Sequence, residues 1–216
     1  NSGIELALLS LNAPGLQGIT DAGKAMDVAK KANDTMAGAE AAHPGRYACL
    51  AALPMHDPEA AAGELTRCVS ELGFKGSLVN GFQQIGSPDN ISYYDQPEYR
   101  AFWATVSELD VPFYLHPRMT IPSQGRAYQD HPWLMSSPWG FAVETSIHAL
   151  RLCGSGLFDE FPNLHQMFWD AIHGAGDVKK STDPAVAEKL LEQIDAIAEV
   201  FWKTEKAKGM GVYPPS

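Results

Sequence analysis

The sequence predicts an α/β protein built on a parallel β-sheet. Apolar runs of strand length begin near residues 4, 47, 74, 111 and 164, and stretches with helical periodicity lie between them. This spacing is typical of βα units, in which a helix returns the chain so that successive strands run in the same direction. Glycine, proline and asparagine residues separate the elements. We therefore expect about five parallel strands with helices between them.

The first third of the chain contains four elements, each bounded by turn residues. They are predicted as a strand at 4–11, a helix at 21–42, a strand at 47–53 and a helix at 58–72. The second helix has a clear start, because Asp57 can accept hydrogen bonds from free N–H groups and Pro58 fits the first helical position. Gly73 supplies its C-terminal stop.

The middle of the chain continues the alternation. The predicted elements are a strand at 74–80, a helix from Asp95, a strand at 111–116, a helix at 141–152 and a strand at 164–169. The helix from Asp95 carries apolar residues at helical spacing, which predict a buried stripe: Tyr99, Phe102, Trp103, Val106 and Leu109. Residues 81–94 are predicted to form a polar loop. A long proline-containing loop follows Arg118, and we expect it to shape or cover a site.

Composition limits the possible functions. The chain has 216 residues with 45% hydrophobic and 19% charged residues, which is ordinary for a globular domain. A net charge of -10 argues against nucleic-acid binding, which needs a basic surface. No run approaches the ~18 apolar residues of a membrane span, and the N-terminus has no signal-peptide pattern. Three cysteines without CxxC spacing predict reduced, buried thiols in a cytoplasmic protein: Cys49, Cys68 and Cys153.

The run Val111 to Arg118 is the strongest candidate for a site. It is an apolar strand that ends in a histidine, a proline and an arginine. In α/β folds the loops after the strands converge at the carboxyl ends, where chemistry takes place. His116 is therefore a candidate metal ligand or proton carrier, although a strand-end histidine can also simply bond to a nearby carbonyl. Asn80 ends the third predicted strand at the same edge and is a candidate substrate contact.

Two architectures fit this pattern. A doubly wound open sheet usually carries a glycine-rich phosphate loop after its first strand, and the turn Asn12-Ala13-Pro14-Gly15 does not match that motif. A closed barrel of βα units needs eight strands in about 250 residues. Five predicted strands cannot close such a barrel.

Several long strings carry a family resemblance: LSLNAPGLQ (9–17), ALPMHDPEAAAGEL (52–65), GSLVNGFQQIG (76–86), YYDQPEYRAFWATVSELDVPFYLHPR (93–118), IPSQGRAYQDHPWLMSSPWGFAVETSIHALRL (121–152) and GSGLFDEFPNL (154–164). They resemble the γ-resorcylate and 2,3-dihydroxybenzoate decarboxylase branch of the amidohydrolase superfamily. The resemblance covers residues 3 to 164.

This resemblance implies a (β/α)8 TIM-barrel-like fold that binds one divalent metal, Zn or Mn. It also implies an enzyme that removes CO2 from an ortho-hydroxybenzoate without oxidation. His116 matches the metal-binding histidine that ends the fifth strand of the family, and Arg118 matches the arginine beside it. Arg118 is expected either to position a substrate carboxylate or to tie down the long loop. His173 is either a displaced catalytic histidine of the family or a loop residue, and His148 is expected to be a packed structural histidine.

The chain departs from the family at both ends. The metal motif of the first strand is absent, and no counterpart of the Gly-His-x-Gly-Glu motif or of the last barrel strands follows Leu164. We therefore expect an incomplete barrel segment over residues 1–175 and a helical tail over 176–216, with a helix that begins near Thr182. The chain is expected to be either a fragment or a shortened form of the enzyme.

Three functions remain open at this point. The first is metal-dependent, non-oxidative decarboxylation of a 2,6- or 2,3-dihydroxybenzoate. The second is an inactive barrel remnant that acts only through association with another chain, and a weaker third is a hydrolase of the amidohydrolase type. The expected partners are a small aromatic carboxylic acid and further copies of the chain, since an unclosed sheet leaves strand edges exposed. Nucleic acid and membrane are not expected partners.

Overall fold

A computed structural model describes residues 4–136 and 138–164. The chain divides into two compact units, Asn1–Gly174 and Ala175–Ser216, and every described residue belongs to the first. The predicted helical tail over 176–216, with its helix from Thr182, therefore lies outside the described residues. Among the described residues, no helix is long and apolar enough to cross a bilayer.

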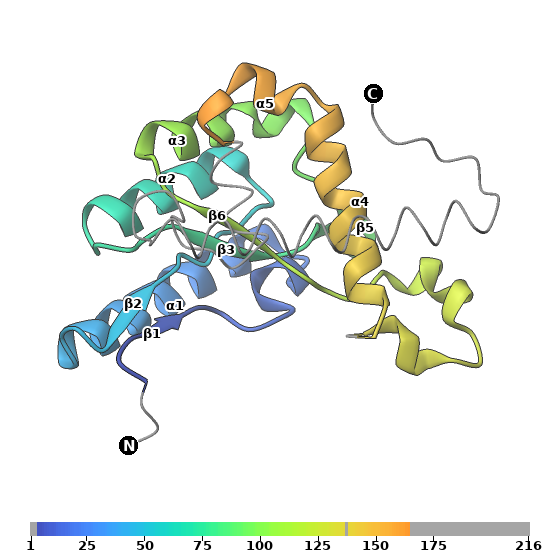
Figure 1. The fold of residues 1–216 in the computed structure, drawn as a ribbon, viewed down its shortest axis with the longest axis horizontal. Coiled ribbons are helices and arrows are strands. Elements are labelled where there is room, and N and C mark those ends of the chain that lie inside the picture. The colour runs from blue at the N-terminus through green and yellow to red at the C-terminus, as the bar shows by residue number, and fades with distance from the viewer. Residues whose placement is uncertain (1–3, 137, 165–216) are drawn as a thin grey trace, which may run out of the picture. The chain divides into compact units, whose positions relative to one another are not determined.

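The centre of the first unit is a parallel arrangement of strands, as the sequence predicts. Strand β1 (Ala7–Leu9) pairs with β2 (Tyr47–Cys49), and β3 (Ser77–Asn80) pairs with β6 (Phe113–His116), both in parallel. A bridge between Ala51 and Ser77 connects the two pairs. The strands therefore follow one another in the order β1, β2, β3, β6 (Figure 1).

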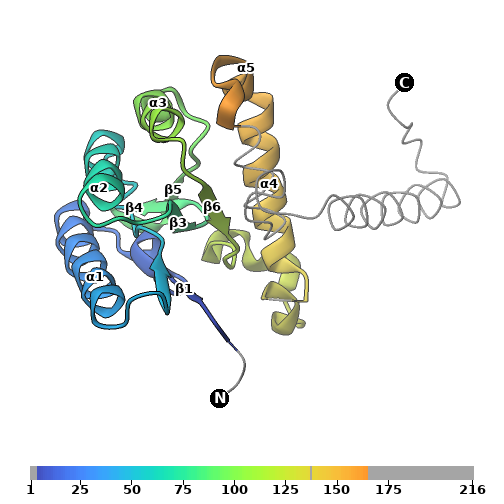
Figure 2. The same cartoon turned by 60° about the vertical axis from the view of Figure 1, so that its left-hand side comes forward.

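A helix follows each of these four strands. They are α1 (Ala22–Ala42), α2 (Pro58–Ser70), α3 (Arg100–Leu109) and α4 (Gly140–Gly154). Figure 2 shows α1, α2 and α3 in succession along one side of the strands. The described residues thus contain four consecutive βα units, which make an incomplete barrel segment.

Aspartate side chains cap the first two helices, as the sequence predicts for Asp57. Asp21 accepts a hydrogen bond from the Lys24 N–H at 2.7 Å, and Asp57 accepts from Glu59 and Ala60 at 3.0 and 3.1 Å. These bonds satisfy N–H groups that have no partner within the first turn of a helix. The predicted starts of α1 and α2 are therefore correct.

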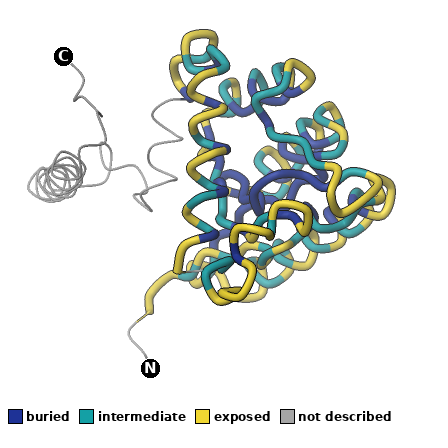
Figure 3. Tube along the Cα trace, turned by 90° about the vertical axis from the view of Figure 1, so that its right-hand side faces the viewer, coloured by how far each residue is buried: buried dark blue, intermediate teal, exposed yellow. Residues whose placement is uncertain are grey.

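The core residues lie on the strands and on the helices that pack against them, and Figure 3 shows many of the buried positions along the central strands. The predicted stripe is confirmed: Tyr99, Phe102, Trp103 and Val106 are buried, and Leu109 packs against them. Tyr99 belongs to a short 3-10 turn, η2 (Pro97–Tyr99), which leads into α3. On the strands, Val79 and Leu115 face the same core.

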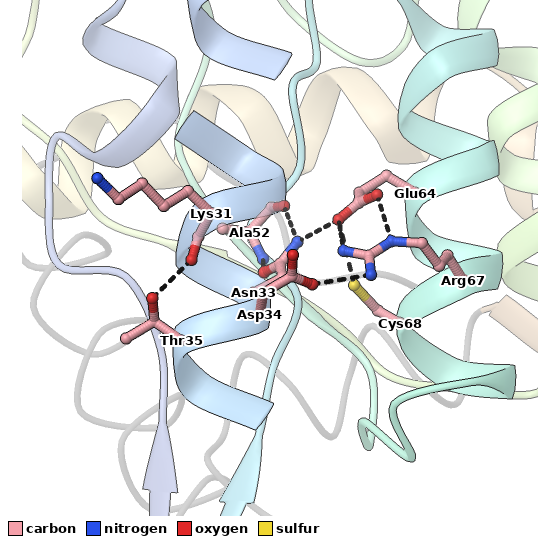
Figure 4. Close-up of polar contacts among 8 residues, drawn as sticks. All are labelled: Lys31, Asn33, Asp34, Thr35, Ala52, Glu64, Arg67 and Cys68. Atoms are coloured by element: carbon pink, nitrogen blue, oxygen red, sulfur yellow. Dashed lines mark hydrogen bonds and ion pairs between the residues drawn. The ribbon is translucent and has the colours of Figure 1, made fainter. Parts of the chain in front are cut away.

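Polar bonds also join α1 and α2 to the segment that follows β2 (Figure 4). The buried Asn33 side chain donates to the Ala52 carbonyl at 3.0 Å and accepts from the Ala52 N–H at 2.9 Å. It also donates to Glu64 at 2.8 Å, and Arg67 forms an ion pair with the same carboxylate at 2.8 Å. Burial opposes ionisation of Glu64, but hydrogen bonds from Arg67 and Asn33 hold its pKa below the ordinary value.

The predicted polar loop 81–94 is wrong in part, because it contains an antiparallel hairpin. Strand β4 (Gln83–Ile85) pairs with β5 (Ser87–Ser92). Side-chain bonds support this hairpin, since Gln84 donates to the Pro88 carbonyl at 2.6 Å and Asn90 donates to the Ile85 carbonyl at 2.9 Å. The sequence lacks the apolar alternation that predicts strands, so periodicity could not find it.

Three further expectations need correction. The long loop contains two short 3-10 helices, η3 (Pro122–Tyr128) and η4 (Pro132–Met135). A short helix, α5 (Leu157–Glu160), follows α4. The fifth strand was expected to begin at Leu164, but Leu164 is helical, and residues 165–169 lie outside the described residues. Cys49 and Cys68 are free and buried, but Cys153 is exposed, because the end of α4 presents it to solvent.

Candidate functional site

The candidate site lies where the parallel strands end. Asn80 and His116 are the last residues of β3 and β6, and the strand register pairs them directly. The structure thus brings together two of the residues that the sequence singles out. Arg118 follows two residues after His116 at the same edge, whereas His173 lies outside the described residues.

The His116 ring is held by a local bond. Its Nδ1 lies 2.8 Å from the carbonyl oxygen of Pro117, the next residue. A carbonyl can only accept, so Nδ1 is the donor of this bond, and in the neutral ring the lone pair is then on Nε2. This is the arrangement that orients histidine ligands in metal sites. Among the described residues, the half-buried His116 ring bonds through Nδ1, and Nε2 is the nitrogen that a ligand role would use.

Asn80 is fixed beneath the segment that follows β1. Its main-chain N–H donates to Gln17 Oε1 at 3.0 Å, and its side-chain amide donates to the Leu11 carbonyl at 3.2 Å. Asn80 is only 1% exposed, and its Oδ1 has no hydrogen-bond partner among the described residues. The structure therefore describes Asn80 as a buried residue at the base of the site.

Gln17 connects several strand ends. It lies in the short 3-10 helix η1 (Gly15–Gly18), where its amide nitrogen donates to the Leu53 carbonyl at 2.9 Å and its oxygen accepts from Asn80. Gln17 is 1% exposed. Our interpretation of the sequence missed this residue, although it closes the string LSLNAPGLQ that carries part of the family resemblance.

Arg118 is buried above the end of β3. Its Nη1 donates to the carbonyl of Phe82 at 2.8 Å and to that of Gln17 at 3.3 Å, while its Nη2 donates to Gln84 Oε1 at 2.9 Å. The guanidinium carbon lies 4.1 Å from the centre of the Phe82 ring, a cation–π contact. Arg118 thus ties η1 and β4 together. Burial lowers its pKa, but a guanidinium stays protonated in proteins.

Two glycines make this packing possible. At Gly81, with φ of +68°, a Cβ atom would lie 2.5 Å from Arg118 Cγ. At Gly15, with φ of +54°, it would lie 2.5 Å from the Asn80 side-chain nitrogen. Both positions therefore need a residue that lacks Cβ and tolerates positive φ.

The remaining described histidines do not join this edge as candidate ligands. His148 is 1% exposed and accepts a hydrogen bond from the Tyr94 N–H at 3.0 Å, which confirms it as a packed structural residue. Burial, assisted by the charge of Arg151, lowers its pKa to about 3. His56 lines a cavity of about 250 Å³ between the first turns of α1 and α2, and neither Asn80, His116 nor Arg118 lines that cavity.

The described residues do not by themselves complete a metal site. Among them, no group of three or more histidine, cysteine, aspartate or glutamate side chains is placed to hold a metal. A catalytic metal usually has at least three protein ligands. His116 is the single predicted metal ligand that lies within the described residues.

Four successive βα units with polar residues at the strand ends define a segment of a (β/α)8 barrel. The chain belongs to the amidohydrolase family, whose model, described as Amidohydrolase, matches residues 7–193. This confirms the predicted superfamily and the barrel class.

Relatives identify the branch of this family. γ-Resorcylate decarboxylase of Rhizobium sp. (strain MTP-10005) is 55% identical over 163 residues, which cover 76% of this chain and 50% of that protein. A crystal structure of 2,6-dihydroxybenzoate decarboxylase complexed with 2,6-dihydroxybenzoate has 55% identity and a TM-score of 0.73, and the match covers 74% of this chain and 50% of the other. The predicted decarboxylase branch is therefore confirmed.

A related structure contains a metal. The dihydroxybenzoic acid decarboxylase of Polaromonas sp. JS666, solved with bound manganese and the inhibitor 2-nitroresorcinol, is 55% identical with a TM-score of 0.73. The match covers 74% of this chain and 48% of that chain. A divalent metal is thus a property of the family, as the resemblance implied.

The matches cover only part of each relative. The chain spans about half the length of the curated relatives it matches. A shorter match is of another kind: the nickel superoxide dismutase of Streptomyces seoulensis is 40% identical over 50 residues, which cover 23% of this chain and 38% of that protein.

Proposed function

We propose that this protein acts in the metal-dependent, non-oxidative decarboxylation of a dihydroxybenzoate of the 2,6 type. The main support is the combination of 55% identity to γ-resorcylate decarboxylase with His116 at the end of β6, where its Nε2 has no hydrogen-bond partner among the described residues. The same identity favours this function over an inactive remnant. No feature of the described residues favours the hydrolase alternative.

The reaction requires two things of the protein. Loss of CO2 from the ring leaves negative charge on a ring carbon, so an acid must deliver a proton there. The substrate must also be held with its carboxylate and neighbouring hydroxyl in a fixed orientation. When bound, a divalent metal stabilises the negative oxygens of such a substrate.

We propose the following roles for residues at the strand ends. His116 is a metal ligand through Nε2, held by its bond to the Pro117 carbonyl. Asn80 and Arg118 are on the substrate side of the site, with Gln17 and Gln84 as their immediate partners. His173 is the proposed proton donor and lies outside the described residues.

We also propose that the protein is a cytoplasmic homo-oligomer. Two free, buried thiols, Cys49 and Cys68, are compatible with a reducing compartment. The edge at β1 carries apolar side chains that are more than half exposed, which favours association: Ile4, Leu6 and Leu8.

Substrate comparison tests the proposed function. The purified chain, loaded with manganese, is incubated separately with 2,6- and 2,3-dihydroxybenzoate, and CO2 release is measured. We expect release from the 2,6 isomer at a rate at least about tenfold above that from the 2,3 isomer, because a site built for two flanking hydroxyls loses a contact with the other isomer. Absence of release from both substrates would rule out the activity for this chain.

A further inference from the structure

Arg118 carries a buried positive charge without a counter-ion in contact. It is 8% exposed, and no carboxylate forms an ion pair with it among the described residues. Glu144 influences it electrostatically but accepts a hydrogen bond from Tyr93 instead. Burying an unpaired charge is costly, and proteins usually avoid it.

The hydrogen bonds of Arg118 do not remove this charge. Its terminal nitrogens donate to two main-chain carbonyls and one amide oxygen, all of them neutral groups. Its Nε is buried and has no partner among the described residues. The side chain therefore keeps both a net charge and an unused donor.

The position of the charge links it to the site. The stem of Arg118 passes over Gly81, because a Cβ there would meet Arg118 Cγ and Cδ. Gly81 follows Asn80, which the register pairs with His116. The charge is thus held at the same strand ends as His116. The proposed substrate would bind there.

We infer that Arg118 selects an anionic ligand through the attraction of its charge rather than through direct hydrogen bonds to the ligand. This rests on the proposed function, because it assigns the ionised carboxylate of a hydroxybenzoate as the missing counter-charge. The neutral aromatic product, resorcinol, has no such charge. Arg118 therefore favours substrate over product and is a specificity-determining residue.

The experiment compares two ligands that differ by the carboxylate. Dissociation constants of 2,6-dihydroxybenzoate and resorcinol are measured by calorimetry on the full chain with manganese. Arg118→Met should reduce the preference for the anion about tenfold, because it removes the Coulomb attraction between the guanidinium charge and the carboxylate. Its affinity for resorcinol should change much less.

Arg126→Met is the matched control. It removes an exposed arginine charge on η3 and leaves Arg118 in place. The preference for the anion should therefore stay at the wild-type value. If Arg118→Met does not fold by circular dichroism, Arg118→Gln takes its place, because an amide can still donate to the Phe82 carbonyl.

Each other outcome overturns the inference. Equal loss of affinity for both ligands in the uncharged variant would mean that Arg118 only supports the loops. An unchanged preference for the anion in that variant would mean that the charge of Arg118 does not influence ligand binding. If the wild-type chain binds neither ligand, the proposed function fails and the inference fails with it, a pattern distinct from the first two.

Discussion

At the residue scale, the tautomer of His116 is decided by its neighbour. The Pro117 carbonyl accepts from Nδ1, so in the neutral ring the lone pair is on Nε2. The sequence predicts the placement of His116 and Asn80 at one edge, because both end apolar strands. It could not predict the contacts of Arg118, since these join residues up to 101 positions apart.

His148 gives a prediction about pH. Its pKa is about 3 in the folded protein, whereas an unburied histidine has a pKa of 6.5. As the pH falls, the unfolded chain therefore takes up the proton before the folded protein does. Stability from this group is therefore complete above about pH 6.5 and is lost as the pH falls from there toward 3. Between pH 7 and pH 5 the wild type should lose about 2 kcal/mol more unfolding free energy than His148→Gln.

Urea unfolding at the two pH values measures this difference. His43→Gln is the control, because His43 is exposed at the end of α1 and should leave the wild-type pH dependence in place. Parallel loss of stability in the wild type and His148→Gln would show that His148 titrates normally.

At the element scale, local chemistry and tertiary packing contribute differently. Asp57, Pro58 and Gly73 define α2 through rules that act within a few residues, so the sequence predicts this helix. The β4–β5 hairpin depends instead on amide bonds from Gln84 and Asn90, which no hydrophobic period reveals. Four of the predicted strands are correct in place, although each is shorter than its apolar run.

Asn33 tests how α1 is held to the strands. Asn33→Ala leaves the buried N–H and carbonyl of Ala52 without partners and removes one bond to Glu64. We expect a loss of about 3 kcal/mol in unfolding free energy, measured by urea denaturation.

The neighbouring residue Asp34 supplies the control. It is 60% exposed and forms an ion pair with Arg67, so Asp34→Ala should cost less than about 1 kcal/mol. Similar losses in the two variants would mean that the Asn33 bonds add little to the attachment of α1.

At the scale of the whole molecule, the described residues contain half the strands of a closed barrel. Four parallel strands follow one another, whereas the family barrel has eight. The family resemblance predicted this incomplete barrel, whereas periodicity alone also fitted a doubly wound open sheet.

The exposed edge at β1 predicts self-association. Leu6 and Leu8 are each 57% exposed, which is unusual for apolar side chains at a sheet edge. We expect light scattering after size exclusion to report an oligomer for the wild type and a shift toward monomer for the double variant Leu6→Lys, Leu8→Lys. A wild type that stays monomeric at all concentrations would contradict the proposed homo-oligomer.

The central claim is that His116 is a metal ligand of a hydroxybenzoate decarboxylase. The most direct test is the manganese content and the CO2 release from 2,6-dihydroxybenzoate for the wild type, His116→Gln and the exposed control His131→Gln. The wild type and the control should bind about one manganese per chain and release CO2, while His116→Gln should lose both, with activity reduced at least about a hundredfold. Equal metal content and equal turnover in His116→Gln and the wild type would contradict the claim.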